Sequence, residues 1–137
     1  MSQPVPKARI LSIEDDPDII DLVRLILEQR GYEVVGMTSG EAGLVAARQL
    51  RPHLILLDLM MPDVDGWEVF RRLRQDPALA SVPVVVVTSK AQSIDKMLGL
   101  HIAKVDDYVT KPFSPEELVT RVESVLERRG WKDAGQD

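Results

Sequence analysis

Short apolar runs that end in a charged or hydroxyl residue are the feature that most constrains the fold of this chain. The clearest runs, with the polar residues that follow them, are Ile10–Ile13 with Glu14-Asp15-Asp16, Leu54–Leu57 with Asp58, and Val84–Val87 with Thr88. A weaker run, Tyr108–Thr110, leads into Lys111. Short aliphatic runs bounded by turn residues are typical of buried parallel strands. The carboxyl ends of parallel strands share one edge of the sheet, where ligands of open α/β sheets bind. We therefore expect these polar residues to converge there.

Strand-like and helical patterns alternate five times along the chain. The expected strands lie near residues 8–14, 33–37, 53–58, 82–88 and 106–110, and the expected helices near 17–30, 39–50, 66–75, 91–102 and 115–129. Such alternation favours a parallel sheet with helices on both faces. Because crossovers are right-handed, the pattern predicts a doubly wound α/β fold with a five-stranded sheet.

Helix-capping residues support these boundaries. Asp16 precedes Pro17 at the expected first helical position, and Gly31 follows the same helix as a left-handed end. Capping boxes are expected at Thr38 with Glu41 and at Ser114 with Glu117, and turn or cap roles at Asp63 and Asp65.

Size and charge exclude several classes of function. A chain of 137 residues predicts one domain at 8–129, with a loose lead at 1–7 and a tail or linker at 130–137. The net charge of −5 argues against direct binding of nucleic acid or an anionic membrane. There is no cysteine, and no apolar stretch is long enough to span a membrane. We expect a cytoplasmic location.

Three acids at adjoining strand ends predict a divalent metal site. Glu14, Asp15 and Asp58 would resist joint ionisation without a cation. Mg²⁺, or Mn²⁺ in its place, prefers such oxygen ligands and keeps several waters. Asp16 has a simpler explanation as the cap before Pro17.

The hydroxyl of Thr88 and the ammonium of Lys111 add groups that can hold phosphoryl oxygens beside a metal. Pro112 is a candidate cis proline. Tyr108 is either a half-buried aromatic or a side chain that switches rotamer near the site.

The chain resembles the receiver domain of bacterial two-component response regulators from about Ala8 to Arg129. The matching stretches are Ile10–Pro17, Leu56–Gly66, Val87–Ser89 and Asp106–Phe113, all in the order and spacing of the family. The resemblance implies a flavodoxin-like (βα)5 three-layer sandwich with strand order 2-1-3-4-5.

The resemblance also implies roles for individual residues. Asp58 would accept a phosphoryl group from a sensor histidine kinase or a phosphotransfer protein. The chain would not be an enzyme but a phosphoacceptor switch that catalyses only its own phosphorylation and dephosphorylation. Asp15, Asp58 and the Met60 backbone carbonyl would bind Mg²⁺, with Glu14 in support. Thr88 and Lys111 would contact the phosphoryl group, and Thr88 and Tyr108 would act as switch residues.

The output implied by the resemblance is a change at the surface of the fourth helix, fifth strand and fifth helix. That surface would act on a downstream protein, on a fused output domain, or in a phosphorylation-dependent homodimer. The last helix also resembles receivers of winged-helix transcription factors, which dimerise through charge pairs. Here Met97 and Ala103 stand where that group has a basic and an acidic residue.

Two other classes share parts of this pattern. A flavodoxin-like nucleotide binder needs a hydroxyl- and glycine-rich loop after the first strand, where this chain has Glu14-Asp15-Asp16. A haloacid-dehalogenase-type phosphatase needs a general acid two residues after its aspartate. Met60 occupies that position and cannot transfer a proton.

Overall fold

A five-stranded parallel sheet with the strand order β2-β1-β3-β4-β5 forms the centre of the molecule. The computed structural model describes residues 7–89 and 105–130. The elements are β1 (Arg9–Ile13), α1 (Pro17–Glu28), β2 (Glu33–Met37), α2 (Gly40–Leu50), β3 (Leu54–Asp58), α3 (Gly66–Gln75), β4 (Val84–Ser89), β5 (Asp107–Lys111) and α5 (Pro115–Arg128). The predicted sheet and strand order are confirmed.

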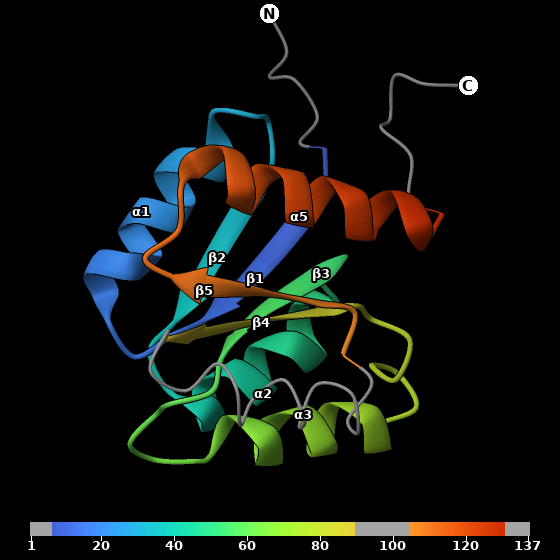
Figure 1. Cartoon of the computed structure of the whole chain (residues 1–137). Helices are drawn as coiled ribbons and strands as arrows, with labels where there is room; N and C mark the ends of the chain where they lie inside the picture. Colours follow the sequence, from blue (N-terminus) through green and yellow to red (C-terminus); the bar gives the residue numbers. More distant parts are fainter. Residues whose placement is uncertain (1–6, 90–104, 131–137) are drawn as a thin grey trace, which may run out of the picture.

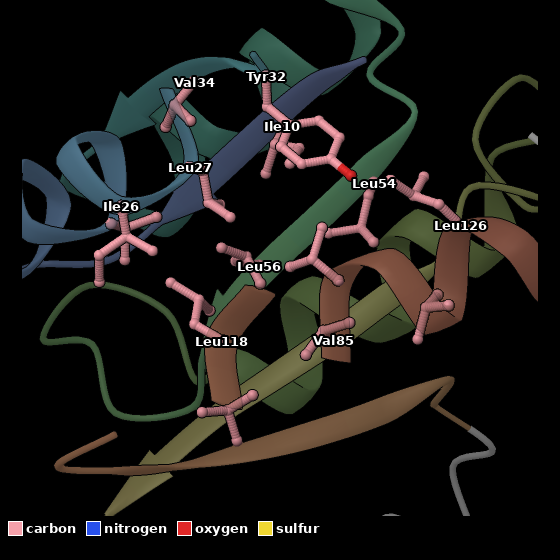
Figure 2. Packing of buried hydrophobic residues seen from close by; sticks show 14 of the residues in the cluster. Ile10, Ile26, Leu27, Tyr32, Val34, Leu54, Leu56, Val85, Leu118 and Leu126 are labelled. Atoms are coloured by element: carbon pink, nitrogen blue, oxygen red, sulfur yellow. The ribbon is translucent and has the colours of Figure 1, made fainter. Parts of the chain in front are cut away.

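Helices cover both faces of the sheet and make three layers. In Figure 1, α1 and α5 lie on one side of the strands, and α2 and α3 lie on the other. Alternate residues of each central strand point to opposite faces, so β3 contributes Leu54 and Leu56 to one core and Ile55 and Leu57 to the other. Figure 2 shows the first of these cores, in which α1 and α5 pack over β1 and β3. The continuous burial of β3 therefore explains its unbroken aliphatic sequence.

The helix starts follow the predicted capping chemistry with one exception. Asp16 and Ser114 cap α1 and α5 by accepting hydrogen bonds from Asp18 N and Glu117 N. At α2 the predicted Thr38 cap is wrong, because Ser39 is the N-cap and its Oγ accepts from Ala42 N at 3.1 Å. Adjacent hydroxyl residues offer the same chemistry, so the pattern left this boundary uncertain by one residue.

The predicted helix at 91–102, together with Met97 and Ala103, lies outside the described residues. Gly31 has a φ of 94°, as expected for a left-handed helix end. The peptide bond between Lys111 and Pro112 is cis. Within residues 7–89 and 105–130, none of the helices is long and apolar enough to cross a membrane.

Candidate metal and phosphoryl site

The carboxyl edge of the sheet gathers the three predicted acids. Glu14 follows β1, Asp58 ends β3, and these strands are adjacent with Ile13 opposite Leu57. One carboxylate oxygen each from Glu14, Asp15 and Asp58 lies within 4.8 Å of the others. Asp15 is exposed, whereas only 3% of Glu14 and 4% of Asp58 is exposed. The three acidic side chains thus converge at this edge, as predicted.

Lys111 joins the acids from the end of β5. Its Nζ lies 2.7 Å from Glu14 Oε1 and 3.7 Å from Asp58 Oδ2. Asp58 also accepts a hydrogen bond from Met60 N at 3.1 Å through Oδ1. Glu14 accepts one from Asp16 N at 3.2 Å through Oε2. The Lys111 ammonium therefore lies close to two buried acids at the ends of different strands.

Burial makes the two inner acids difficult to ionise. The pKa of Glu14 is raised to about 7, first by burial and then by repulsion from Asp58, although the Lys111 ammonium opposes the shift. Burial also raises the pKa of Asp58, against the hydrogen bond from Met60 N and the charge of Lys111. Additional positive charge at this site would therefore favour the fully ionised form of the acids.

Thr88 lies buried at the same edge with its hydroxyl unpaired. Its Oγ1 makes no hydrogen bond to any described residue, and only 2% of the residue is exposed. A buried hydroxyl without a partner is costly, which points to a group that binds there in another state.

The two other predicted residues, Tyr108 and Met60, belong to segments that carry site residues: Tyr108 lies on β5, which ends at Lys111, and Met60 lies in the loop after Asp58. Tyr108 is half-buried on β5 opposite Val86 and packs against the core under α2 and α3. Met60 lies two residues after Asp58 and is 56% exposed. The switch role of Tyr108 and the metal-binding role of the Met60 carbonyl stay predictions.

The acids fit a hard divalent cation. When all are ionised, three carboxylates and the Lys111 ammonium leave a net charge of two negative units, which a divalent ion would balance. Oxygen donors from two strands suit Mg²⁺ or Mn²⁺, and the exposed Asp15 leaves room for the waters that Mg²⁺ retains.

A contact that the sequence did not indicate involves Asp63. We expected a local turn residue, but both oxygens of its carboxylate accept hydrogen bonds from the first turn of α2, at Gly40 N and Glu41 N. Asp65, by contrast, caps its own helix α3 as predicted, by accepting from Trp67 N at 2.8 Å. The one available signal was the expected helix start near residue 39, which needed a partner for its N–H groups.

The fold and the acid-lined edge together define the class of protein, a doubly wound α/β domain with a candidate metal site at the carboxyl ends of its strands. A sequence model of the response regulator receiver domain matches residues 10–123. The chain therefore belongs to the response regulator receiver domain family, within two-component signalling.

Relatives with established names agree with this assignment. The DNA-binding dual master transcriptional regulator RpaA of Synechocystis sp. is 48% identical over 120 residues, which are 88% of this chain and 49% of that protein. The DNA-binding response regulator MtrA of Mycolicibacterium smegmatis is 43% identical over 122 residues, which are 89% of this chain and 52% of MtrA. The chain thus spans about half the length of these relatives.

A solved structure supports the fold. The chemotaxis response regulator CheY4 of Vibrio cholerae matches with a TM-score of 0.79 and 27% identity, over 86% of this chain and 98% of that chain.

Proposed function

We propose that this chain accepts a phosphoryl group on Asp58 and uses the resulting aspartyl phosphate as a signalling switch. The observation that supports this most strongly is the placement of Asp58. It is a buried acid at a strand end, next to two other acids and the Lys111 ammonium. A carboxylate in such surroundings costs stability, and an acceptor role in a metal-assisted transfer accounts for that cost.

In the proposed reaction, an Asp58 carboxylate oxygen attacks the phosphorus of a phosphohistidine on a sensor kinase or a phosphotransfer protein. The bond between phosphorus and the imidazole nitrogen breaks, and the imidazole leaves with the electron pair. Mg²⁺ held by Glu14, Asp15, Asp58 and the Met60 carbonyl would neutralise phosphoryl oxygens. Attack of water on the phosphorus would later release inorganic phosphate and restore the carboxylate.

Lys111 and Thr88 would bind the transferred group. Lys111 Nζ already lies within 4 Å of both Glu14 and Asp58, so a short movement would bring it onto a phosphoryl oxygen. The unpaired Thr88 Oγ1 would gain the hydrogen bond that it lacks. A shift of Thr88 and a rotation of Tyr108 would then favour one of two surface conformations.

The proposed output surface includes β5, α5 and the segment that precedes β5. On it, Asp107 pairs with Arg121 and Arg128 within one chain. A homodimer that used these groups would exchange such pairs for pairs between chains. Because RpaA and MtrA are named as DNA-binding and this chain matches about half of each, we propose that an output domain or a separate downstream protein receives the signal.

Mass spectrometry after treatment with acetyl phosphate and Mg²⁺ tests this proposal. We expect a single added phosphate on the wild-type chain, and none on Asp58→Asn or in the presence of EDTA. A phosphate that persists in Asp58→Asn would refute the assignment of the acceptor. Repeated turnover of a phosphomonoester, lost in the same variant, would instead favour a phosphatase.

A further inference from the structure

The loop that follows the proposed phosphoacceptor, residues 59–65, is tied to a helix from an earlier part of the chain. Asp63 Oδ1 accepts a hydrogen bond from Gly40 N at 3.0 Å, and Oδ2 accepts one from Glu41 N at 3.2 Å. The N–H groups of a first helical turn have no partner within the helix and carry partial positive charge. A single carboxylate therefore uses both of its oxygens to hold the loop against α2.

Packing beneath Asp63 reinforces this contact. A Cβ atom built on Gly40 would lie 3.0 Å from both Val64 Cβ and Val69 Cγ2, so α2 begins in close contact with the loop and with α3. The base of the loop is also closed, because Gly66 N donates to Leu59 O at 3.2 Å. The loop is thus fixed at its base by its own backbone and at its tip by α2.

We propose that Asp63 is a positioning residue for the metal and phosphoryl site. By holding the 59–65 loop on α2, it fixes the backbone that follows Asp58. That backbone includes the Met60 N–H, which donates to Asp58 Oδ1, and the Met60 carbonyl assigned to the metal. This inference rests on the proposed function.

Electrostatics keeps Asp63 in its ionised form. The hydrogen bonds from Gly40 N and Glu41 N hold the pKa of the Asp63 carboxyl below its usual value. Both oxygens of the ionised Asp63 carboxylate therefore remain available as acceptors for the first turn of α2.

The chain provides a matched control for a purely structural role. Ser39 caps the same first turn of α2 through Oγ, which accepts from Ala42 N at 3.1 Å. Ser39 precedes α2 directly and is not part of the 59–65 loop. Ser39→Ala and Asp63→Ala thus both remove a cap from α2, but only Asp63→Ala releases the loop.

The test compares wild type, Asp63→Ala, Asp63→Asn and Ser39→Ala by Mn²⁺ titration with electron paramagnetic resonance and by the rate of phosphorylation with acetyl phosphate. We expect Asp63→Ala to bind Mn²⁺ about tenfold more weakly, the lower end of effects seen for residues that support metal ligands. Its phosphorylation should slow, and Asp63→Asn, which keeps one acceptor oxygen, should be intermediate. Ser39→Ala should match wild type in both, although both alanine variants should unfold at lower urea concentration.

Equal Mn²⁺ affinity and phosphorylation rate in Asp63→Ala and Ser39→Ala would reduce Asp63 to a helix cap and overturn the inference. If Asp63→Ala does not fold, Asp63→Asn takes its place in the same comparison with Ser39→Ala. Failure of the wild type to bind Mn²⁺ or to be phosphorylated would overturn the proposed function itself. The two failures are distinguishable, because one appears only in the variants.

Discussion

Charged side chains at the amino ends of the strands differ in burial and pairing from those at the carboxyl ends. We call these two sides of the sheet the amino edge and the carboxyl edge. At the amino edge, Arg9 pairs with Glu33 at 2.6 Å, and both side chains are about 40% exposed. At the carboxyl edge, Glu14 and Asp58 are almost completely buried and have like charge, with Lys111 between them. Exposed pairs cost and contribute little, whereas buried acids of like charge are costly to keep. The buried acids at the carboxyl edge therefore lower the free energy of unfolding, as expected of residues that form a binding site.

The largest change in the free energy of unfolding should come from removing the Lys111 ammonium at the carboxyl edge. Lys111→Met leaves two buried acids without their counter-charge, and we expect a loss of about 4 kcal/mol in the free energy of unfolding at pH 8 without divalent ions. Urea denaturation measures this loss. Adding Glu14→Gln to Lys111→Met should recover part of it. An unchanged free energy of unfolding in Lys111→Met would mean that burying the two acids together does not cost stability.

The second effect is the pH dependence caused by Glu14. Its pKa is about 7 in the folded chain and 4.5 for an unperturbed glutamate, so between these values the folded chain holds a proton that the unfolded chain releases. The associated stability is present below pH 4.5 and is lost as the pH rises through 7, by at most about 3 kcal/mol. Urea denaturation in EDTA from pH 5 to pH 8 should show this decline in wild type.

Two comparisons check the origin of that decline. Glu14→Gln should lose most of it, because glutamine does not titrate and only the raised pKa of Asp58 remains, and saturating Mg²⁺ should reduce it in wild type by balancing the charged acids. The same decline in Glu14→Gln would assign the effect to another group.

A smaller effect of opposite sign is expected at Thr88. Replacing its unpaired hydroxyl with a methyl group in Thr88→Val should raise the free energy of unfolding by about 1 kcal/mol. The same variant should lose the conformational response to phosphorylation. Thr110, which lies opposite Thr88 on β5 and is half-buried, provides the control. A stability gain in Thr110→Val as large as in Thr88→Val would show that the effect is not specific to the site.

The smallest effect should appear at the amino edge. Removing this partly exposed pair with Arg9→Met should change the free energy of unfolding by roughly 0.5 kcal/mol. Urea denaturation at low and high salt measures this change. An effect as large as that of Lys111→Met would remove the contrast between the two edges.

The sheet and the acid cluster could both be predicted from the sequence, because the order and direction of the strands bring their ends together. Asp58 was readable since four buried aliphatic residues lead into it. The bridge from Lys111 to Glu14 was not readable, because it depends on how far two side chains reach across the site. The contact from Asp63 to α2 was missed for a related reason. It joins residues 23 positions apart, and the expected helix start near residue 39 indicates that its N–H groups need a partner but not which side chain supplies it.

The most direct measurement of the central claim is calorimetric titration of Mg²⁺ into the wild-type chain and into Asp15→Asn at pH 8. Asp15 is exposed, so its substitution should leave the fold intact while removing one oxygen ligand. We predict that the wild type binds one ion and that Asp15→Asn binds it at least about tenfold more weakly. Equal binding by both proteins, or no binding by the wild type, would contradict a metal site at the carboxyl edge.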